Sequence, residues 1–225
     1  MQQKQNMRAN YCPCDGIDMP KSPDKTLEFY NRNADSFMEN TLHADMHETQ
    51  DHFLELVEPG SRILDFGCGS GRDARYFLSH GYQVDAVDGS AELVRKVYEQ
   101  LGIPVRQLLF QDLSEVDCYD GIWACASILH LPKSELKDVV KKMTTALHDN
   151  GVIYASFKYG TFEGERNGRY FTDFTEETIL DFLQNMPAVQ IRKCWITADV
   201  RPGRDDEKWL NLILCKAGND RLSCR

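Results

Sequence analysis

Three glycines at alternate positions, Gly67, Gly69 and Gly71, follow the apolar run RILDF of residues 62–66. Glycine adopts positive φ and lets a ligand approach the backbone closely, so such a turn between a strand and a helix can bind a nucleotide-like molecule. Asp88 ends the next apolar run, roughly 20 residues beyond the first glycine, where its carboxylate can accept both hydroxyls of a ribose. The pattern predicts a site for an adenosine-type ligand.

The turn does not fit a dinucleotide. A dinucleotide loop reads G-x-G-x-x-G and faces a pyrophosphate, whereas Arg72 occupies the position of the last glycine here. Asp65, just before the turn, would repel a pyrophosphate but would suit a ligand that carries an ammonium group. S-adenosylmethionine (SAM) carries an ammonium, a carboxylate and a sulfonium and no phosphate. The residues therefore favour SAM over NAD.

The elements that must position this turn alternate between strand and helix. Residues 25–57 have a helical pattern, and 160–174 are glycine-rich and polar, which predicts a loop. Because strands alternate with helices, we expect an α/β Rossmann-like doubly wound sheet that is mostly parallel. The last two strands have no helix between them and predict an antiparallel edge hairpin. Strands are predicted at 62–66, 82–88, 105–110, 119–126, 152–159, 189–197 and 209–217, and further helices at about 72–80, 90–102, 133–151 and 175–186.

The bulk composition is that of an ordinary globular chain. It has 225 residues, 42% of them hydrophobic and 27% charged. We expect one domain over residues 25–217, a flexible arm over 1–24 and a tail over 218–225. The net charge of −9 disfavours broad adhesion to nucleic acid or to an anionic membrane. No apolar run approaches the roughly 20 residues of a membrane span.

The cysteines and the first residues favour a reducing compartment. The eight cysteines are scattered, and three of them lie in apolar strand-like runs, which is typical of free buried thiols. Residues 12–14, CPC, lack the spacing of a zinc site. The first residues lack the apolar region of a secretory signal. We expect a cytoplasmic protein without a metal, and its oligomeric state is left open.

Four segments carry a family resemblance. ILDFGCGSGRD, VDAVDGS, LLFQDL and YDGIWACASILHL resemble, in order and spacing, the first four motifs of class I SAM-dependent methyltransferases. The resemblance covers about residues 27–217 and implies a seven-stranded sheet with helices on both faces. GCGSGRD followed by GYQVDAVDGS is similar to the small bacterial group that includes the tellurite-resistance methyltransferases. The resemblance implies transfer of a methyl group from SAM to a small molecule, leaving S-adenosylhomocysteine.

The resemblance also implies which residues hold the cofactor. The glycine turn and Asp65 would line the methionine and ribose end of SAM, and Asp88 would hold the ribose hydroxyls. An aromatic residue of the N-terminal segment, Tyr30, would lie over the cofactor, unless it serves only as core packing. The residues expected to bind the cofactor are Tyr30, Asp65, Gly67, Cys68, Gly69, Ser70, Gly71, Asp88, Gly89, Ser90, Gln111, Asp112, Leu113, Ala124, Cys125 and Ala126.

The acceptor is expected beyond the carboxyl ends of the strands, as in other open α/β sheets. His130 follows the fourth predicted strand and is a candidate base or substrate anchor, or else a histidine packed over the sheet end. Cationic residues gather in two neighbouring loops and predict a clamp for an anion, unless they pair with nearby carboxylates. The residues expected to bind the substrate are Lys158, Tyr159, Arg166, Arg169, Tyr170, Arg201 and Arg204.

Other interpretations remain open. A tRNA or protein methyltransferase would be expected to carry a basic extension, which is absent from this sequence. A non-catalytic SAM-binding regulatory protein would have the same cofactor motifs, because a fold does not fix a function. His43 and His47 share one helix face with the spacing of metal ligands, but no third ligand follows, so a solvated face or a lid is favoured.

Overall fold

The computed structural model describes residues 24–217. The arm expected over residues 1–24 lies outside the described residues, apart from Asp24. The tail expected over 218–225 and the cysteines of the CPC segment also lie outside them. One seven-stranded sheet runs through the molecule in the order β3-β2-β1-β4-β5-β9-β8. The strands are β1 Arg62–Phe66, β2 Gln83–Asp88, β3 Val105–Gln107, β4 Tyr119–Ala124, β5 Leu147–Lys158, β8 Val189–Ala198 and β9 Lys208–Lys216.

Strand directions confirm the predicted α/β fold class. Strands β1 to β5 pair in parallel, whereas β9 pairs antiparallel with both β5 and β8. Consecutive residues of a strand point to opposite faces, so Ile63 packs into one core layer and Leu64 into the other. Trp123 and Ile122 alternate in the same way on β4. Both faces are apolar because both must be covered by helices.

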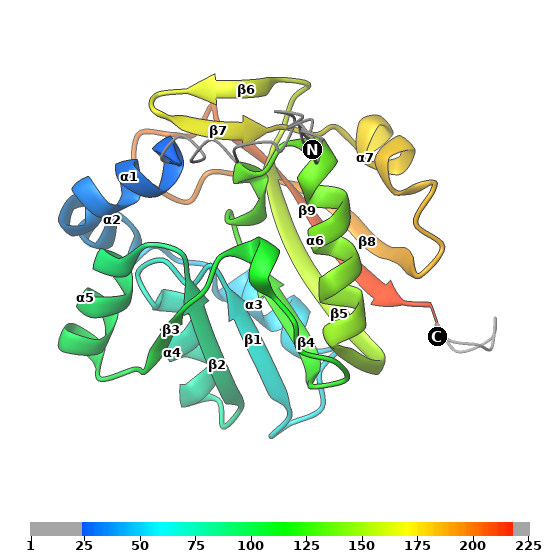
Figure 1. The fold of residues 1–225 in the computed structure, drawn as a ribbon, viewed down its shortest axis with the longest axis horizontal. Helices are drawn as coiled ribbons and strands as arrows, with labels where there is room; N and C mark the ends of the chain where they lie inside the picture. Colours follow the sequence, from blue (N-terminus) through cyan, green and yellow to red (C-terminus); the bar gives the residue numbers. More distant parts are fainter. Residues whose placement is uncertain (1–23, 218–225) are drawn as a thin grey trace, which may run out of the picture.

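Helices cover both faces of the sheet (Figure 1). The layer with Leu64 packs against α6 (Lys133–Ala146) and α7 (Glu176–Leu183). The layer with Ile63 packs against α3 (His47–Leu54) and α4 (Arg72–Ser79). Helix α5 (Ala91–Leu101) packs beside β2 and β3. The remaining helices are α1 (Lys25–Arg32) and α2 (Ala34–Thr41), with 3₁₀ turns η1 (Phe110–Asp112) and η2 (Ile128–His130).

The segment predicted to be helical over residues 25–57 is helical and consists of three short helices, α1, α2 and α3. At Asn33 the backbone leaves the helical region with φ −112°, and the side chain donates to the carbonyl of Phe29. This local side-chain bond competes with the helical ladder. The break turns α2 away from α1, and both lie above the carboxyl ends of the parallel strands in Figure 1.

The polar loop predicted over residues 160–174 is wrong. It contains a two-stranded hairpin, β6 (Glu163–Arg166) and β7 (Arg169–Thr172), that lies at the top of Figure 1. Asn167 and Gly168 connect the strands with φ of 52° and 76°. Asn-Gly is the preferred two-residue turn for a hairpin because both residues accept positive φ. The dipeptide was therefore a readable signal.

Two boundaries differ from the prediction. Helix α6 ends at Ala146 rather than near Gly151, and β5 begins at Leu147. Asn150, with φ 65°, lies inside the β5 segment, where the pairing with β4 shifts register. The third strand stops at Gln107, and the segment that follows it is the turn η1.

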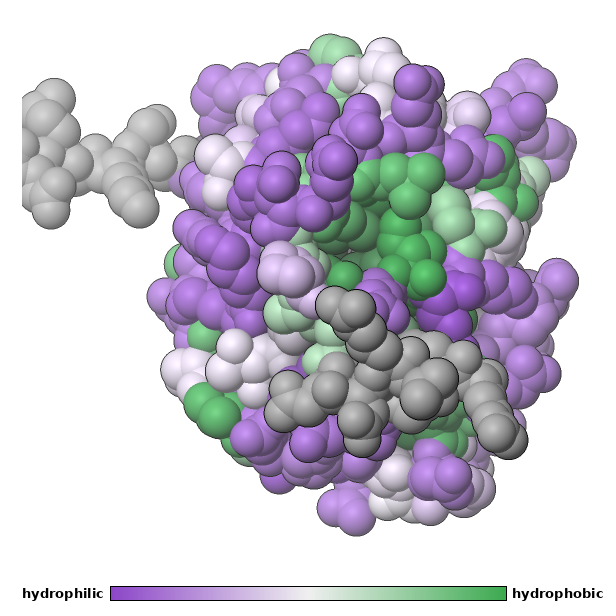
Figure 2. Space-filling view, turned by 90° about the vertical axis from the view of Figure 1, so that its right-hand side faces the viewer, coloured by the Kyte–Doolittle hydropathy of each residue, from purple (hydrophilic) through white to green (hydrophobic). Residues whose placement is uncertain are grey.

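Apolar residues also reach the surface on the side that carries α7 and β8. Figure 2 shows them in a hollow surrounded by hydrophilic residues. A small apolar hollow lies between α6, α7 and the sheet, where Ile179, Phe182 and Leu183 line it together with Val140. Among residues 24–217, no helix has both the length and the apolar character needed to cross a membrane.

Candidate functional site

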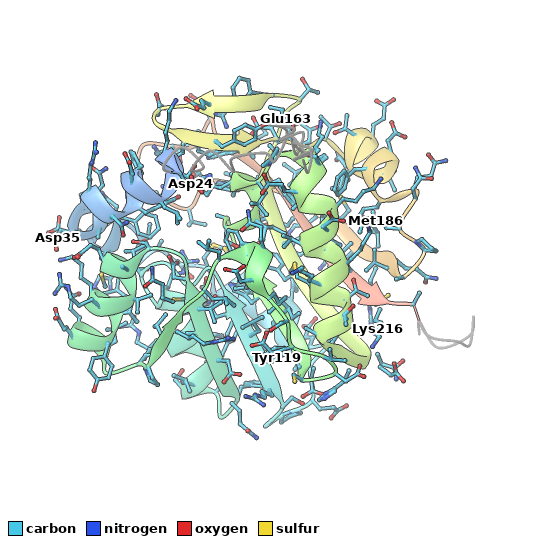
Figure 3. The ribbon with its side chains drawn as sticks, viewed as in Figure 1. Asp24, Asp35, Tyr119, Glu163, Met186 and Lys216 are labelled. Atoms are coloured by element: carbon cyan, nitrogen blue, oxygen red, sulfur yellow. The ribbon has the colours of Figure 1, made fainter. Side chains whose placement is uncertain are left out.

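A cavity of about 1160 Å³ lies at the carboxyl ends of the parallel strands. The loops after β1, β2 and β4 form one part of its wall, and α1, α2, the β6–β7 hairpin and the connection from β8 to β9 form the other. Asp24 and Glu163, labelled in Figure 3, mark this end of the molecule, and Tyr119 lies near the opposite end. The volume is large enough for a cofactor and a small second molecule.

The glycine turn approaches its neighbours too closely for side chains. A Cβ atom on Gly67 would lie 2.5 Å from the Cβ of Ser127, and one on Gly69 would lie 3.0 Å from the ring of Phe37. Both glycines have positive φ, 87° and 56°. Gly71 lines no part of the cavity, because a Cβ there would meet Val97 of α5.

Asp88 connects the second strand to the glycine turn. Its Oδ2 accepts from the amide of Gly69 at 2.9 Å, and its Oδ1 accepts from the amide of Ser90 at 2.8 Å. Burial raises the pKa of Asp88, while the two amides oppose that shift. Each carboxylate oxygen retains a lone pair for a hydroxyl of a bound ligand.

Asp65 lies behind the turn with 1% of its surface exposed. Its Oδ2 has no hydrogen-bond partner among the described residues, and burial together with the nearby Asp73 raises its pKa well above the usual range. Burial also disfavours ionisation of Asp73, but Arg72 donates two hydrogen bonds to it and holds its pKa below the usual value. The raised pKa favours the uncharged acid, and Asp65 does not line the cavity, so a ligand ammonium would have to approach this buried group and thereby favour its ionised form.

His130 is held from both sides. Its Nδ1 lies 2.6 Å from the carbonyl oxygen of Tyr170 on β7, and its Nε2 lies 2.8 Å from the hydroxyl of Tyr30 on α1. A carbonyl only accepts, so Nδ1 carries the proton and Nε2 accepts from Tyr30. Burial, with the charges of Arg169 and Arg166, lowers the pKa of His130 to about 4. The imidazole is therefore neutral at physiological pH.

Arg169 differs from the other cations of its loops. Its guanidinium carbon lies 4.4 Å from the ring centroid of Phe29 and 5.0 Å from that of Phe171. Its Nη1 is 3.5 Å from the hydroxyl of Tyr30, and its Nε is buried without a partner among residues 24–217. No carboxylate of the described residues forms an ion pair with it. The side chain lines the cavity.

The other four cations predicted to clamp an anion are paired with carboxylates. Arg166 binds both oxygens of Asp173, and Arg201 binds both oxygens of Asp199. Lys158 of β5 pairs with Asp199 and Glu207 of the β8–β9 connection. Arg204 pairs with Glu207 within that connection. Pairing with nearby carboxylates was the alternative interpretation of these cations. The nearest candidates in the sequence were Glu163 or Glu165 for the hairpin arginines and Asp205 or Asp206 for Arg204, and the structure pairs Arg166 and Arg204 with other carboxylates.

Most of the predicted residues surround this cavity. On its wall are Tyr30, Gly67, Cys68, Gly69, Ser70, Asp88, Gly89, Gln111, Cys125, Ala126, His130, Lys158, Tyr159, Arg166, Arg169, Arg201 and Arg204. The others lie off the wall for local reasons. Leu113 and Ala124 are core residues, Ser90 caps α5, and the hydroxyl of Tyr170 turns to Glu163. Asp65, Gly71 and Asp112 are also off the wall.

Sequence reasoning missed the aromatic and acidic partners. Phe29 and Phe171 contact Arg169, and Asp173 and Asp199 hold the neighbouring arginines. A readable signal exists only for Arg201, because Asp199 precedes it by two residues. Among residues 24–217, no group of three or more histidine, cysteine or acidic side chains is placed to hold a metal ion. His47 packs against Tyr76 instead.

Comparison with known proteins agrees with this geometry. Residues 63–151 match the methyltransferase domain family. An uncharacterized methyltransferase of Geobacillus kaustophilus is 24% identical over 177 residues, 71% of this chain and 81% of that protein. Hemagglutinin 1 of Eikenella corrodens is 27% identical over 131 residues, 56% of this chain, and the match spans 43% of that protein's length.

A solved structure shares the fold. The Burkholderia thailandensis 1,6-didemethyltoxoflavin-N1-methyltransferase, with 1,6-didemethyltoxoflavin and S-adenosylhomocysteine bound, superposes with a TM-score of 0.68 at 18% identity over 85% of each chain. The seven-stranded order and its antiparallel edge are those of a class I methyltransferase. The matched domain, the methyltransferase relative and this fold together support an SAM-dependent methyltransferase with SAM as its cofactor.

Proposed function

We propose that the protein transfers a methyl group from SAM to a small anionic acceptor bound in the cavity. The observation that carries the proposal is Arg169, a guanidinium on the cavity wall that lacks a carboxylate partner among the described residues. A buried donor without a partner costs free energy, and an oxyanion presents acceptors that match the guanidinium. The four neighbouring cations each pair with a carboxylate, from the set Asp173, Asp199 and Glu207, so their donors are engaged in the walls and are less available to an anion than those of Arg169.

The cofactor belongs in the part of the cavity with the glycine turn. We assign the ribose hydroxyls to Asp88, the ammonium to the side of Asp65, and the close backbone approach to Gly67 and Gly69. When bound, SAM supplies an activated methyl group on its sulfonium. The protein then has to align the acceptor with that group and to exclude water.

A small acceptor suits the enclosure. Helix α1 and the hairpin meet across the cavity, because the amide of Tyr170 donates to the hydroxyl of Thr26 at 3.1 Å and Lys25 pairs with Glu165. The structural neighbour that holds 1,6-didemethyltoxoflavin supports a small acceptor in such a fold. The resemblance to the tellurite-resistance group places oxyanions of tellurium and selenium among the acceptors to test.

Calorimetry tests the cofactor first. The protein is titrated with SAM, S-adenosylhomocysteine and NAD, and micromolar binding of the first two without NAD is expected. Transfer of radiolabelled methyl groups is then measured with small carboxylates, phosphates and oxyanions, and with their uncharged analogues. Methylation of uncharged analogues alone would refute the anionic acceptor. Tight RNA binding at moderate salt, with methylation of RNA alone, would refute the small acceptor.

A further inference from the structure

Tyr30 and His130 form a hydrogen-bonded pair that cofactor binding does not explain. They are 100 residues apart, yet the hydroxyl of Tyr30 lies 2.8 Å from Nε2 of His130, and both side chains line the cavity. His130 also packs its ring against Phe171 of the hairpin, with ring centroids 4.9 Å apart. The pair therefore joins α1, the loop after β4 and the hairpin at one point of the wall.

The direction of this hydrogen bond is fixed. Because the Tyr170 carbonyl holds the proton on Nδ1 of His130, Nε2 has only a lone pair to offer, and the hydroxyl of Tyr30 must donate to it. The proton of Tyr30 is committed to the histidine. The phenol oxygen can then only accept a hydrogen bond from a molecule in the cavity, apart from its long contact with Arg169.

The pair lies between the cofactor turn and Arg169. The ring of Tyr30 contacts the ring of Phe37 edge to face, with centroids 5.2 Å apart, and Phe37 lies against Gly69 of the turn. The hydroxyl oxygen of Tyr30 is 3.5 Å from Nη1 of Arg169. An acceptor whose anionic group binds Arg169 and whose nucleophile faces the cofactor passes the phenol oxygen.

We infer that Tyr30 and His130 take the proton from a hydroxyl acceptor while it is methylated. The acceptor oxygen forms a bond to the methyl carbon as the bond from that carbon to the sulfonium breaks. The hydroxyl proton moves to the phenol oxygen of Tyr30, and the phenol proton moves to Nε2 of His130. The products are a methyl ether, S-adenosylhomocysteine and an imidazolium, which later releases one proton to solvent. This inference rests on the proposed methyl transfer to an anionic acceptor.

The strength of the base selects a hydroxyl over an amine. An amine gives a methylammonium whose pKa is roughly 10, as for lysine, and a neutral imidazole of pKa roughly 6.5 or lower cannot remove that proton. A methylated hydroxyl that keeps its proton is an oxonium, which is a far stronger acid than imidazolium. The lowered pKa of His130 makes the imidazole a still weaker base toward a methylammonium, while an oxonium remains acidic enough to be deprotonated.

The charged groups around the pair link anion binding to the base. Burial is the main cause of the lowered pKa of His130, and the charges of Arg169 and Arg166 lower it further. Burial raises the pKa of Tyr30, as does Asp88, while Arg169 and Arg201 oppose that shift. An anion on Arg169 offsets its positive charge. The imidazole therefore becomes a stronger base when an anionic acceptor is in place than when the cavity lacks one.

The test uses hydroxymethylbenzoates and the matching aminomethylbenzoates, which share a carboxylate and differ only in the nucleophile. Their amines are attached to an sp³ carbon, so the methylated ammonium has the high pKa of an alkylamine. Labelled methyl transfer is measured for the wild type, Tyr30→Phe, His130→Gln and the double variant. Tyr98→Phe, at an exposed position on α5, serves as the matched control. S-adenosylhomocysteine calorimetry is run on every variant and reports folding and cofactor binding separately from turnover.

We expect the wild type to methylate the hydroxyl set, and each single variant to lower kcat roughly 100-fold, which is typical of a lost acid–base group. The double variant should lose no more than either single variant, because the two groups act as one relay. Binding of S-adenosylhomocysteine should stay within about threefold of the wild type, because Tyr30→Phe keeps the aromatic ring expected over the cofactor and removes only the hydroxyl. His130→Gln leaves Asp88 and the glycine turn unchanged.

Three results would overturn the inference. These are methylation of the amines alone, no methylation of any hydroxymethylbenzoate, and losses in the two single variants that add in the double variant. The first of them leaves the proposed methyl transfer standing. Failure of the wild type to bind SAM and S-adenosylhomocysteine would instead refute the proposed function itself.

Discussion

The two halves of the cavity are built differently. The half that we propose for the cofactor comes from strand ends and the turns that follow them, and its key hydrogen bonds join Asp88 to the amides of Gly69 and Ser90. The half that we propose for the acceptor joins segments far apart in the chain, as in the hydrogen bonds from Tyr30 to His130 and from the amide of Tyr170 to Thr26. One half rests on backbone geometry, and the other rests on side chains brought together by the fold.

This difference indicates which changes each half should tolerate. Substitutions in the cofactor half should act on SAM binding and on the backbone of the turn. Substitutions in the acceptor half should act on turnover, on acceptor binding and on pH dependence, and they should leave cofactor affinity largely unchanged.

The largest expected effect is that of Asp88→Ala. Loss of two charge-assisted hydrogen bonds to the ribose should weaken S-adenosylhomocysteine binding by at least about 100-fold, since each contributes about 1.5–3 kcal/mol. Calorimetry measures it, with Asp88→Asn as the isosteric variant and Asp138→Ala on exposed α6 as the control. Unchanged affinity in Asp88→Ala would show that this carboxylate does not bind the ribose.

A second expected effect is the pH dependence of stability from His130. Its pKa falls from about 6.5 unfolded to about 4 folded, so its neutral form stabilises the fold fully above pH 6.5. That contribution is lost as the pH falls toward 4, and it amounts to about 3 kcal/mol at 1.36 kcal/mol per pKa unit. Urea unfolding at pH 7 and pH 4 should show a steeper loss for the wild type than for His130→Gln. Equal losses would contradict a buried neutral imidazole.

Arg169→Met separates the anion site from the cofactor site. Removing the guanidinium should raise the KM of an anionic acceptor roughly 10-fold to 100-fold, the range of one charged hydrogen bond. The affinity for S-adenosylhomocysteine should not change. Arg95→Met on exposed α5 is the matched control. If Arg169→Met weakens the binding of the acceptor and of S-adenosylhomocysteine equally, the two ligands do not occupy separate parts of the cavity.

The smallest expected effect compares two glycines of nearly equal φ. Gly67 has φ 87° and a Cβ there would lie 2.5 Å from Ser127, whereas Gly81 has φ 84° and nothing within 4 Å. Alanine is strained at both positions, but only at Gly67 does it also overpack, by about 1–3 kcal/mol. Urea unfolding of Gly67→Ala and Gly81→Ala measures this difference, and calorimetry should show weaker S-adenosylhomocysteine binding for Gly67→Ala alone. Equal stability of the two variants would show that close packing at the turn is unimportant.

Much of the cofactor half could be predicted from the sequence because its contacts are local. Glycines at 67 and 69, and a carboxylate at the end of the next strand, have meaning from spacing alone, since parallel strands end at the same edge of a sheet. Gly71, Ser90 and Leu113 were assigned to the ligand by resemblance, but they lie off the cavity wall because they face α5, cap it, or fill the core.

The acceptor half could be predicted only as a set of loops. The hairpin turn Asn167-Gly168 was readable, but nothing in the sequence says that Tyr170 offers its carbonyl to His130 and turns its hydroxyl away. Nor does it say which cation lacks a carboxylate, because Arg166 finds Asp173 across the hairpin and Lys158 finds Asp199 from another strand.

The sequence by itself determined the strand and helix alternation, the glycine turn and Asp88, because hydrophobic periodicity and φ requirements act over a few residues. Only the tertiary structure decided that Tyr30 donates to His130 and that Arg169 faces the cavity without a carboxylate partner among the described residues. Those outcomes depend on where α1 and the hairpin pack over the strand ends. Distances between residues a hundred or more positions apart follow from packing and not from spacing.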